Sequence, residues 1–320
     1  MLPWSEKHRP ASLEEVGGNV DVLTSLRSFR TVADVPHLIL HGPPGSGKTS
    51  SVLAMARSFF GEGSVSTMLL ELNAGDVRGV ETMRNQIQCF TRCSSVAETE
   101  STAIKMVVLD EADSLTHHAQ CALRHLIETF NKNVRFCLCC NYVNKISPGL
   151  RSRCTVFRFS GLRKEQLHGI LRTVAAKEEL AETSCSELDA IVDVCSGDAR
   201  QALNLLQSLN LGNKASVTTE TVYDSCGLPS PVQGDAIFRT LLSEGFSASH
   251  ESLSHLVNER QFSLETIISL LVDRIILGSH GSVFTGKMRR VLSVLACAER
   301  CLLRGGSESI AIGAVVAAFH

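Results

Sequence analysis

The stretch that decides the fold is residues 37–49, which read HLILHGPPGSGKT. A short apolar run of strand length leads into a glycine-rich loop, and a helical pattern begins near Thr49. The loop has the spacing G-x-x-x-x-G-K-[ST], which binds phosphate groups when it lies between a strand and a helix. Both neighbours are present here, so the sequence predicts a phosphate-binding loop within an α/β domain.

The residue types of this loop suit that chemistry. Glycines let backbone N–H groups close around phosphate oxygens, and the positive end of the following helix points at them. Lys48 is predicted to reach the outer phosphates and Thr49 to hold Mg²⁺. The loop residues expected to contact the nucleotide are Gly42, Pro43, Pro44, Gly45, Ser46, Gly47, Lys48 and Thr49.

Carboxylates end a second buried strand at residues 106–113, which read MVVLDEAD. Behind a phosphate loop, Asp110 is expected to hold Mg²⁺ through water and Glu111 to polarise the attacking water. Asp113 has no derivable chemical role and is expected to cap the helix that starts near Thr116. Asn141 ends the next strand, where an amide can orient the water or touch the terminal phosphate. A plain turn residue is the alternative for Asn141, and the other motifs favour the site.

Apolar runs and helical stretches alternate through the first half of the chain. The strand candidates are HLILH, MLLELN, KMVVLD, RFCLCCN and TVFRFS. This rhythm predicts an α/β fold with a parallel five-stranded sheet and flanking helices. The pattern becomes helical after Gly161, and glycine and prolines at 227–231 mark a second boundary. We therefore expect a nucleotide-binding domain at 1–160, a helical lid domain at 161–228, and an all-helical domain of about five helices at 229–320.

The composition is that of a globular protein, with 44% hydrophobic and 20% charged residues. A formal net charge of -2 provides no chain-wide basic field, so any contact with nucleic acid must come from a local patch. The sequence has neither the apolar core of a signal peptide nor a run long enough to span a membrane. We expect a soluble intracellular protein without a membrane partner.

Twelve cysteines raise the question of a metal site, above all Cys137, Cys139 and Cys140. The outer pair has the spacing of zinc ligands. The three lie in an apolar run of strand length, however, where side chains alternate between faces, and no second Cys or His pair stands at a suitable distance. We expect buried free thiols in a reducing compartment.

Four further segments accompany these motifs: LPWSEKHRP at 2–10, LNAGDVRG at 72–79, Ser152-Arg153-Cys154 and Gly197-Asp198-Ala199-Arg200. With them, nearly the whole chain resembles the small subunits of replication factor C, the eukaryotic sliding-clamp loader. The resemblance implies a nuclear AAA+ ATPase that uses ATP and Mg²⁺ between neighbouring subunits of a heteropentameric spiral. The 229–320 domain becomes a collar that holds the ring. Two further partners are implied, the sliding clamp (proliferating cell nuclear antigen) and primer–template DNA.

The resemblance also assigns roles by position. Lys48, Thr49, Asp110, Glu111 and Asn141 keep the roles derived above. Added to them are Val16, Gly17 and Ser50 as nucleotide contacts, Arg200 as the lid arginine that senses the terminal phosphate, Arg153 as the finger that completes a neighbour's site, and Arg78 and Arg84 as contacts to DNA phosphates. Arginine suits these tasks because its planar charged fork offers two donors to phosphate oxygens. An exposed surface arginine is the competing interpretation at each position.

Two residues depart from the family pattern. His8 stands where tyrosine is usual near the adenine pocket, and His125 follows Arg124 where a second arginine is usual. The second departure could weaken the link between DNA binding and Glu111, because histidine is mostly neutral near pH 7. Two other functions fit the sequence less well. An inert ring member conflicts with the intact Glu111, and a stand-alone motor on branched DNA would need a substrate-gripping insertion that the sequence lacks.

Overall fold

The computed structural model of the chain describes residues 2–75, 80–92, 104–180, 185–212, 218–259, 262–277 and 285–320. The chain divides into two compact units, residues 1–214 and 215–320. Among the described helices and strands, the first unit contains all of the strands, and the second contains only helices. The finer division into three domains, with boundaries after residues 160 and 228, stays a prediction.

The first unit is built on a parallel sheet of five strands, as the sequence predicts. The strands are β1 (Leu38–His41), β2 (Leu69–Asn73), β3 (Lys105–Asp110), β4 (Val134–Cys140) and β5 (Thr155–Arg158). Their order across the sheet is β2-β3-β4-β1-β5, and every pairing is parallel. The carboxyl ends of all five strands therefore lie along one edge of the sheet.

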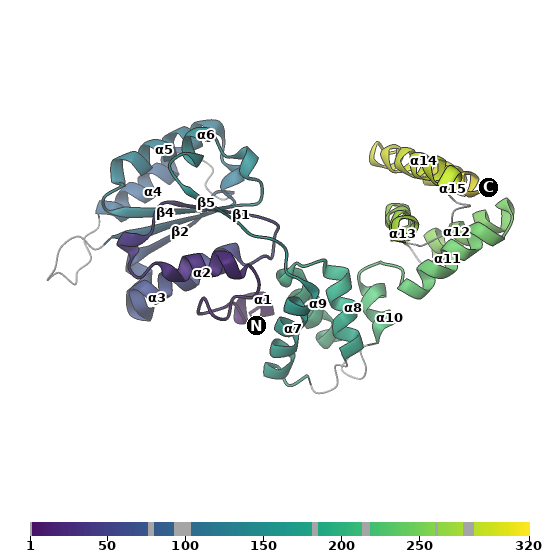
Figure 1. The fold of residues 1–320 in the computed structure, drawn as a ribbon, viewed down its shortest axis with the longest axis horizontal. Coiled ribbons are helices and arrows are strands. Elements are labelled where there is room, and N and C mark those ends of the chain that lie inside the picture. Colours follow the sequence, from purple (N-terminus) through teal and green to yellow (C-terminus); the bar gives the residue numbers. More distant parts are fainter. Residues whose placement is uncertain are drawn as a thin grey trace. The chain divides into compact units, whose positions relative to one another are not determined.

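Helices cover both faces of this sheet (Figure 1). One face carries α2 (Val20–Ser28) and α3 (Lys48–Met68), and the other carries α4 (Val80–Arg92), α5 (His117–Phe130) and α6 (Pro148–Arg151). Short 3-10 turns occupy Val32–Asp34, Ala112–Ser114 and Val143–Lys145. This is the three-layer arrangement that alternating strands and helices produce.

Alternate residues of each central strand enter opposite cores. Leu40 of β1 and Val108 of β3 pack in the core that contains α2 and α3. Ile39 and Val107, one position earlier on the same strands, pack in the core that contains α4 and α5. Successive side chains of a strand point to opposite faces, so a strand covered on both faces must be apolar throughout. That requirement explains the continuous apolar runs in the sequence.

The cysteines of β4 follow the same alternation. Cys137 and Cys139 lie in the core with α2 and α3, and Cys140 lies in the opposite core. All three are buried and free, as predicted. Burial raises the pKa of the Cys137 thiol to about 12 and that of Cys140 to about 11. Because Cys137 and Cys140 face away from each other, they cannot bind one zinc ion together.

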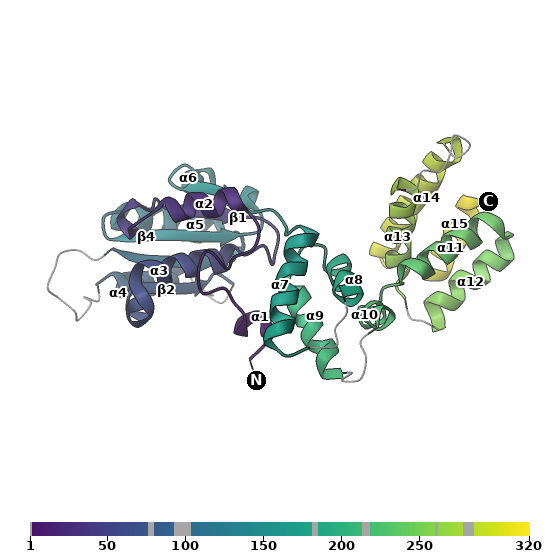
Figure 2. The same cartoon turned by 60° about the horizontal axis from the view of Figure 1, so that its bottom comes forward.

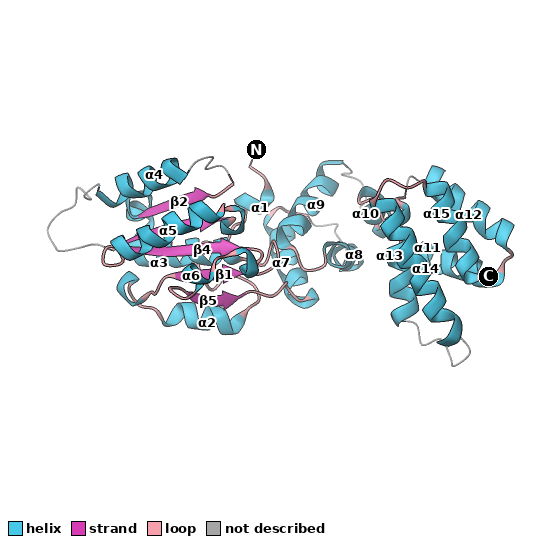
Figure 3. Ribbon diagram, turned by 90° about the horizontal axis from the view of Figure 1, so that it is seen from above, coloured by secondary structure: helices cyan, strands magenta, loops and turns pink. Residues whose placement is uncertain are grey.

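Three helices follow the sheet within the first unit, and we call them the lid. They are α7 (Lys164–Lys177), α8 (Cys185–Cys195) and α9 (Ala199–Gly212), close to the predicted 164–179, 186–195 and 198–209. Their inward faces bury Leu167, Ile191 and Leu206. The short helix α1 (Trp4–Lys7) lies beside α9 (Figure 2). Strands β1, β4 and β5 point their carboxyl ends towards α1 and α7 (Figure 3).

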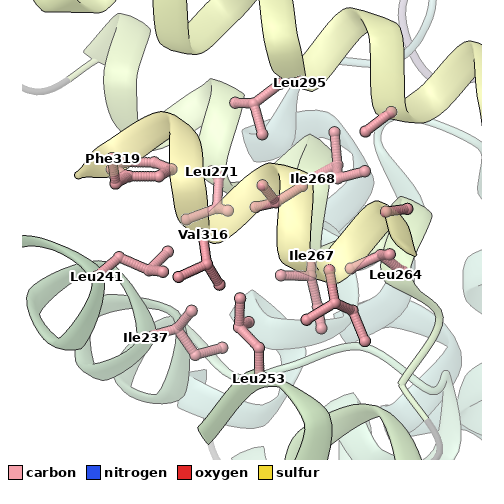
Figure 4. Close-up of a cluster of buried hydrophobic side chains, with 14 of the residues drawn as sticks. Ile237, Leu241, Leu253, Leu264, Ile267, Ile268, Leu271, Leu295, Val316 and Phe319 are labelled. Carbon is pink, nitrogen blue, oxygen red and sulfur yellow. The ribbon is translucent and has the colours of Figure 1, made fainter. Parts of the chain in front are cut away.

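The described residues of the second unit are helical. Its helices are α10 (Thr219–Ser225), α11 (Pro231–Ser243), α12 (Phe246–Glu259), α13 (Leu264–Leu277), α14 (Thr285–Leu303) and α15 (Glu308–Phe319). Leu241, Leu253, Leu271, Leu295 and Val316 come from five of these helices and converge in one core (Figure 4). The predicted five helices after residue 229 are confirmed as α11 to α15.

Helix α10 was not predicted, because a helix of seven residues is too short to show a helical period. Throughout the described ranges, no helix has both the length and the apolar character needed to cross a membrane.

A buried histidine fixes the start of β1. His37 is 7% exposed, its Nδ1 accepts a hydrogen bond from the backbone N–H of Phe136 at 3.1 Å, and its Nε2 lies 3.0 Å from Oδ1 of Asn131. An acceptor at Nδ1 and a donor at Nε2 define the neutral imidazole. Burial is the main cause that lowers the pKa of His37, and the hydrogen bond to Asn131 partly opposes it.

The free energy of unfolding should therefore decrease as the pH falls below about 6.5, because the unfolded chain then binds a proton that folded His37 resists. Urea unfolding at neutral and at mildly acidic pH measures this decrease. His37→Gln should show a smaller difference between the two conditions than the wild-type chain. Replacing the exposed His118 by Gln is the matched control and should leave the difference unchanged. Equal pH dependence in the wild type and in His37→Gln would contradict the assignment.

Candidate nucleotide-binding site

The phosphate loop connects β1 to α3 at the carboxyl edge of the sheet. Its first residue, Gly42, donates a backbone hydrogen bond to the carbonyl of Cys140 at the end of β4, at 3.3 Å. Helix α3 begins at Lys48, so the free N–H groups of its first turn belong to the end of the loop. Gly45 has a φ of +63°, and a Cβ there would lie 1.8 Å from Oδ1 of Asp198. Both conformation and space therefore require glycine at position 45.

Lys48 holds the loop against the neighbouring strand. Its Nζ donates to the carbonyl oxygens of Gly42 and Pro43, both at 2.8 Å, and to Oδ1 of Asn141 at 3.1 Å. The residue is only 8% exposed, and this burial lowers the pKa of its ammonium group, while the charge of Asp110 acts in the opposite direction. The structure thus brings Lys48 and Asn141 together at the end of β4, as the phosphate-site hypothesis requires.

Thr49 and Asp110 form the second pair of the site. The hydroxyl of Thr49 donates to Oδ2 of Asp110 at 2.8 Å, which joins the first turn of α3 to the end of β3. Mg²⁺ prefers oxygen ligands and is commonly bound by one or two carboxylates together with substrate phosphates. A hydroxyl and a carboxylate beside a phosphate loop are the donor set that this ion needs.

Glu111 has a strained backbone. Its φ and ψ are 53° and 35°, the left-handed region, which costs about 1–3 kcal/mol for a residue other than glycine. The Glu111 N–H donates to Oδ1 of Asp110 at 2.9 Å, and the side chain is exposed. Strain of this kind persists where the position of a side chain matters for function. It occurs here at the carboxylate expected to polarise the attacking water.

The expected role of Asp113 as a helix cap is wrong. Thr116 directly precedes α5, and its Oγ1 accepts a hydrogen bond from the backbone N–H of Ala119 at 3.3 Å. Asp113 instead lies in the preceding 3-10 turn, and its Oδ2 accepts from the N–H of Tyr142 at 3.3 Å. A cap must immediately precede the first helical turn, so Asp113 is too early in the chain. Its hydrogen bond links Tyr142, the residue after Asn141, to the 3-10 turn that follows Glu111.

These side chains border a cavity of about 710 Å³ in the first unit, a volume typical of small-molecule sites. The predicted residues that line it are Val16, Gly17, Pro44, Gly45, Ser46, Gly47, Lys48, Thr49, Ser50, Asp110, Glu111, Asn141 and Arg200. Gly42 and Pro43 were predicted as nucleotide contacts but do not line the cavity. Their carbonyls hold Lys48 instead.

Arg200 enters the cavity from the first turn of α9. Asp198 caps this helix, because its Oδ1 accepts from the N–H groups of Arg200 at 2.9 Å and Gln201 at 3.1 Å. A cation in the first turn faces the positive end of the helix dipole, an arrangement that is unfavourable in itself. A bound anion would offset it. The position therefore suits an arginine that contacts a phosphate.

Val16 and Gly17 form the wall between the loop and the lid. Val16 is 6% exposed, and its Cγ1 would lie 3.2 Å from a Cβ built on Gly47. A Cβ built on Gly17 would lie 2.9 Å from Cδ1 of Ile170 on α7. The lid thus packs directly on this wall, and a larger residue at position 17 would force the Ile170 side chain to move.

Of the other three predicted arginines, the structure describes Arg153 and Arg84. Arg153 does not line the cavity; its Nη2 pairs with Oε1 of Glu128 on α5 at 2.6 Å, and its side chain is 40% exposed. Arg84 lies exposed on α4. Arg78 lies outside the described residues. Arg153 therefore does not line the cavity that Lys48 and Arg200 border.

Sequence reasoning missed most of the lining that the lid and the first ten residues contribute, beyond His8 and Arg200. The additional lining residues include Ser5, Arg9 and Pro10 near the start of the chain, and Gln166, Ile170, Thr173, Val174 and Leu203 of the lid. The helical period of the lid could be recognised, but the period does not tell which face meets a ligand. The tertiary contact between Gly17 and Ile170 decides that face.

Comparison with known proteins places this chain in a family. The sequence model described as "ATPase family associated with various cellular activities (AAA)" matches residues 38–162. The chain is 37% identical to replication factor C subunit 3 of Saccharomyces cerevisiae, with 100% of the chain and 94% of the relative aligned. It is 38% identical to replication factor C subunit 5 of Homo sapiens, with 100% and 92% aligned.

The chain belongs to the replication factor C subunits. The family resemblance found in the sequence is thereby confirmed, and the chain is an ATPase of the AAA+ class. Nucleotide binding follows from that class.

A solved structure of a Thermotoga maritima RuvB Holliday junction branch migration motor has a similar fold. It has a TM-score of 0.54 at 18% identity and covers 82% of this chain and 90% of its own. At this identity the likeness concerns the fold alone, and it agrees with the predicted AAA+ architecture.

Replacing Glu111 by Gln should leave ATP binding unchanged and slow hydrolysis at this site by at least about 100-fold, because an amide cannot accept the proton of the attacking water. ATP binding can be measured by calorimetry and hydrolysis by single-turnover assay in the assembled complex. Wild-type hydrolysis in the variant would remove Glu111 from the mechanism. Loss of binding would instead indicate that the carboxylate shapes the site.

Proposed function

We propose that this chain is an ATPase subunit of a clamp-loader complex in the nucleus. The complex opens a sliding clamp, proliferating cell nuclear antigen, and loads it onto primer–template DNA, and ATP hydrolysis triggers release. In this proposal the other subunits are further replication factor C proteins in a heteropentamer. Residues 1–160 bind ATP, 161–228 form the lid, and 229–320 form the collar.

One observation carries the proposal. Relatives named replication factor C subunits align with the whole chain, and the residues that ATP chemistry needs come together at one cavity. An inert ring member would not need a strained, exposed Glu111 next to the Thr49–Asp110 pair. The intact site therefore favours a subunit that hydrolyses ATP.

The proposed reaction is transfer of the terminal phosphoryl group of ATP to water. The water oxygen forms a bond to the terminal phosphorus, the bond from that phosphorus to the bridging oxygen breaks, and Glu111 accepts the proton. Lys48, Asn141 and Arg200 contact the phosphate oxygens. Mg²⁺, held by Thr49 and by Asp110, would neutralise the charge of the phosphates.

Arg153 is proposed to act on the ATP of a neighbouring subunit. Its guanidinium donates from Nη1 to the carbonyl of Gly149 at 2.8 Å and pairs through Nη2 with Glu128. Both partners belong to the surface formed by α5 and α6. An arginine that is held on an exposed surface and does not line its own subunit's cavity suits a finger supplied in trans.

For DNA, Arg84 is proposed to contact backbone phosphates from the exposed face of α4. Contacts to phosphates position a protein without reading base sequence. Arg78, which lies outside the described residues, is proposed to act with Arg84 on the strength of the family resemblance alone.

The clamp-loading function predicts a specific defect for Lys48→Ala. In a ring reconstituted with its partner subunits, the variant should bind less ATP and load less clamp onto primed DNA, because the buried ammonium that contacts the outer phosphates is lost. Clamp loading can be followed by fluorescence of labelled clamp and DNA. Lys132→Ala, at an exposed lysine, is the control and should load normally. Normal loading by rings that lack this chain would refute the function.

Arg153→Ala should leave ATP binding by this chain intact and slow hydrolysis at the neighbouring site, on the order of a thousandfold, because the arginine stabilises charge that develops during transfer. Arg153→Lys should be slow as well, since an ammonium lacks the planar fork. The affected site can be identified by combining the variant with phosphate-loop knockouts, one subunit at a time. A defect that maps to the site containing Lys48 would contradict a role in trans.

A further inference from the structure

A segment at the start of the chain connects the two sides of the nucleotide cavity. Residues 3–10, which we call the strap, include α1 (Trp4–Lys7). Trp4 is 4% exposed, and its backbone N–H donates to Oε1 of Gln207 on α9 at 2.9 Å. At the other end of the strap, the carbonyl of Pro10 accepts from Nη1 of Arg57 on α3 at 3.4 Å. The strap therefore joins a sheet-covering helix to the helix that carries Arg200.

A single carboxylate fixes the centre of the strap to the lid. Oε1 of Glu178, at the end of α7, accepts from Nζ of Lys7 at 2.5 Å and lies 2.6 Å from Nε2 of His8. The side chains of His8 and Glu178 are only 9% and 13% exposed. The hydrogen bonds from Lys7 and then from His8 lower the pKa of the Glu178 carboxyl. Both contacts therefore favour the ionised form of the carboxyl group.

The strap also forms one wall of the cavity. Ser5, His8 and Pro10 line the cavity from the strap, and Ile170 and Val174 line it from α7. The phosphate loop lines another part of the cavity, and there Lys48 and the Thr49–Asp110 pair would hold the phosphates. The base of a nucleotide held there must extend away from the loop. The wall formed by the strap and α7 is the part of the cavity that can receive it.

We infer that Glu178 is a positioning residue for nucleotide binding, which ties the strap to the lid and so forms the wall against the base. The inference rests on the nucleotide site proposed above. It assigns to the Lys7–His8–Glu178 cluster a role on the base side of the ligand and none at the phosphates. His8 then contributes a hydrogen bond to Glu178 as well as a ring to the pocket.

The inference predicts that affinity is lost only for ligands that have a base. Glu178→Ala should weaken binding of ATP and of ADP to the full chain about tenfold, the effect expected when two charge-assisted hydrogen bonds are lost. Binding of inorganic tripolyphosphate should be unchanged. Glu178→Gln keeps an acceptor without the charge and should fall between the wild type and Glu178→Ala. Calorimetry with the three ligands measures all of these affinities.

Two control variants separate the inference from the site on which it rests. Lys48→Ala should weaken the binding of ATP and of tripolyphosphate alike, and unchanged ATP binding there would overturn the nucleotide site itself. Glu165→Ala, at an exposed carboxylate on the first turn of α7, should behave as the wild type. Glu178→Ala that binds ATP normally, or that loses ATP and tripolyphosphate equally, would overturn the role of Glu178 while leaving the site in place.

The strap contains its own reporter, because Trp4 is the only tryptophan in the sequence. Its ring meets the ring of His8 edge-on, with centroids 6.5 Å apart. In Glu178→Ala the emission of Trp4 should move to longer wavelength as the strap separates from the lid, and ATP should partly reverse the change. Lys7→Ala, at a half-exposed lysine, should give a smaller shift and guards against a folding defect in the first variant. Unchanged emission in both variants would show that the strap does not depend on this carboxylate.

Discussion

Parallel pairing of β1, β3 and β4 is the constraint on which the rest of this structure depends. With Leu40 opposite Cys139 and Val108 opposite Cys137, the carboxyl ends of three strands distant in sequence lie next to one another. Lys48, Asp110 and Asn141 each follow or end one of these strands. Parallel sheets require buried crossovers with helices on both faces, so the same constraint produces the two cores and places the site at the sheet edge.

The site combines favourable and unfavourable local features. Lys48 is buried and Glu111 has a left-handed backbone, while Arg200 carries its charge at the positive end of α9. Each of these would cost stability in an ordinary domain. Together they surround one cavity with two cations and two carboxylates, an arrangement that suits a phosphate–metal ligand. The cost is offset by the packed cores behind the site, where the central strands are fully buried.

The lid and the strap give the cavity its remaining walls. Contacts from the strap to Gln207 and Glu178 reach the last and first helices of the lid, and Ile170 packs against the wall at Gly17. Any movement of the lid would therefore change the walls of the cavity through side chains that do not take part in the chemistry.

Local sequence determined the elements and the chemistry of this protein. The five strands, the lid helices, the phosphate loop and the Asp110–Glu111 pair all follow from short-range patterns, because hydrophobic period and loop spacing are properties of neighbouring residues. Tertiary structure decided which groups meet. Packing between elements sets the relative positions of the residues in four features of the structure. These are the cap formed by Thr116 in place of Asp113, the hydrogen bonds from Lys48 to the carbonyls of Gly42 and Pro43, the lining of the cavity by α7, and the contact of Glu178 with His8. The hydrophobic periodicity of a segment does not predict such contacts. Each contact depends on how two elements are oriented relative to each other, and the folded core sets that orientation.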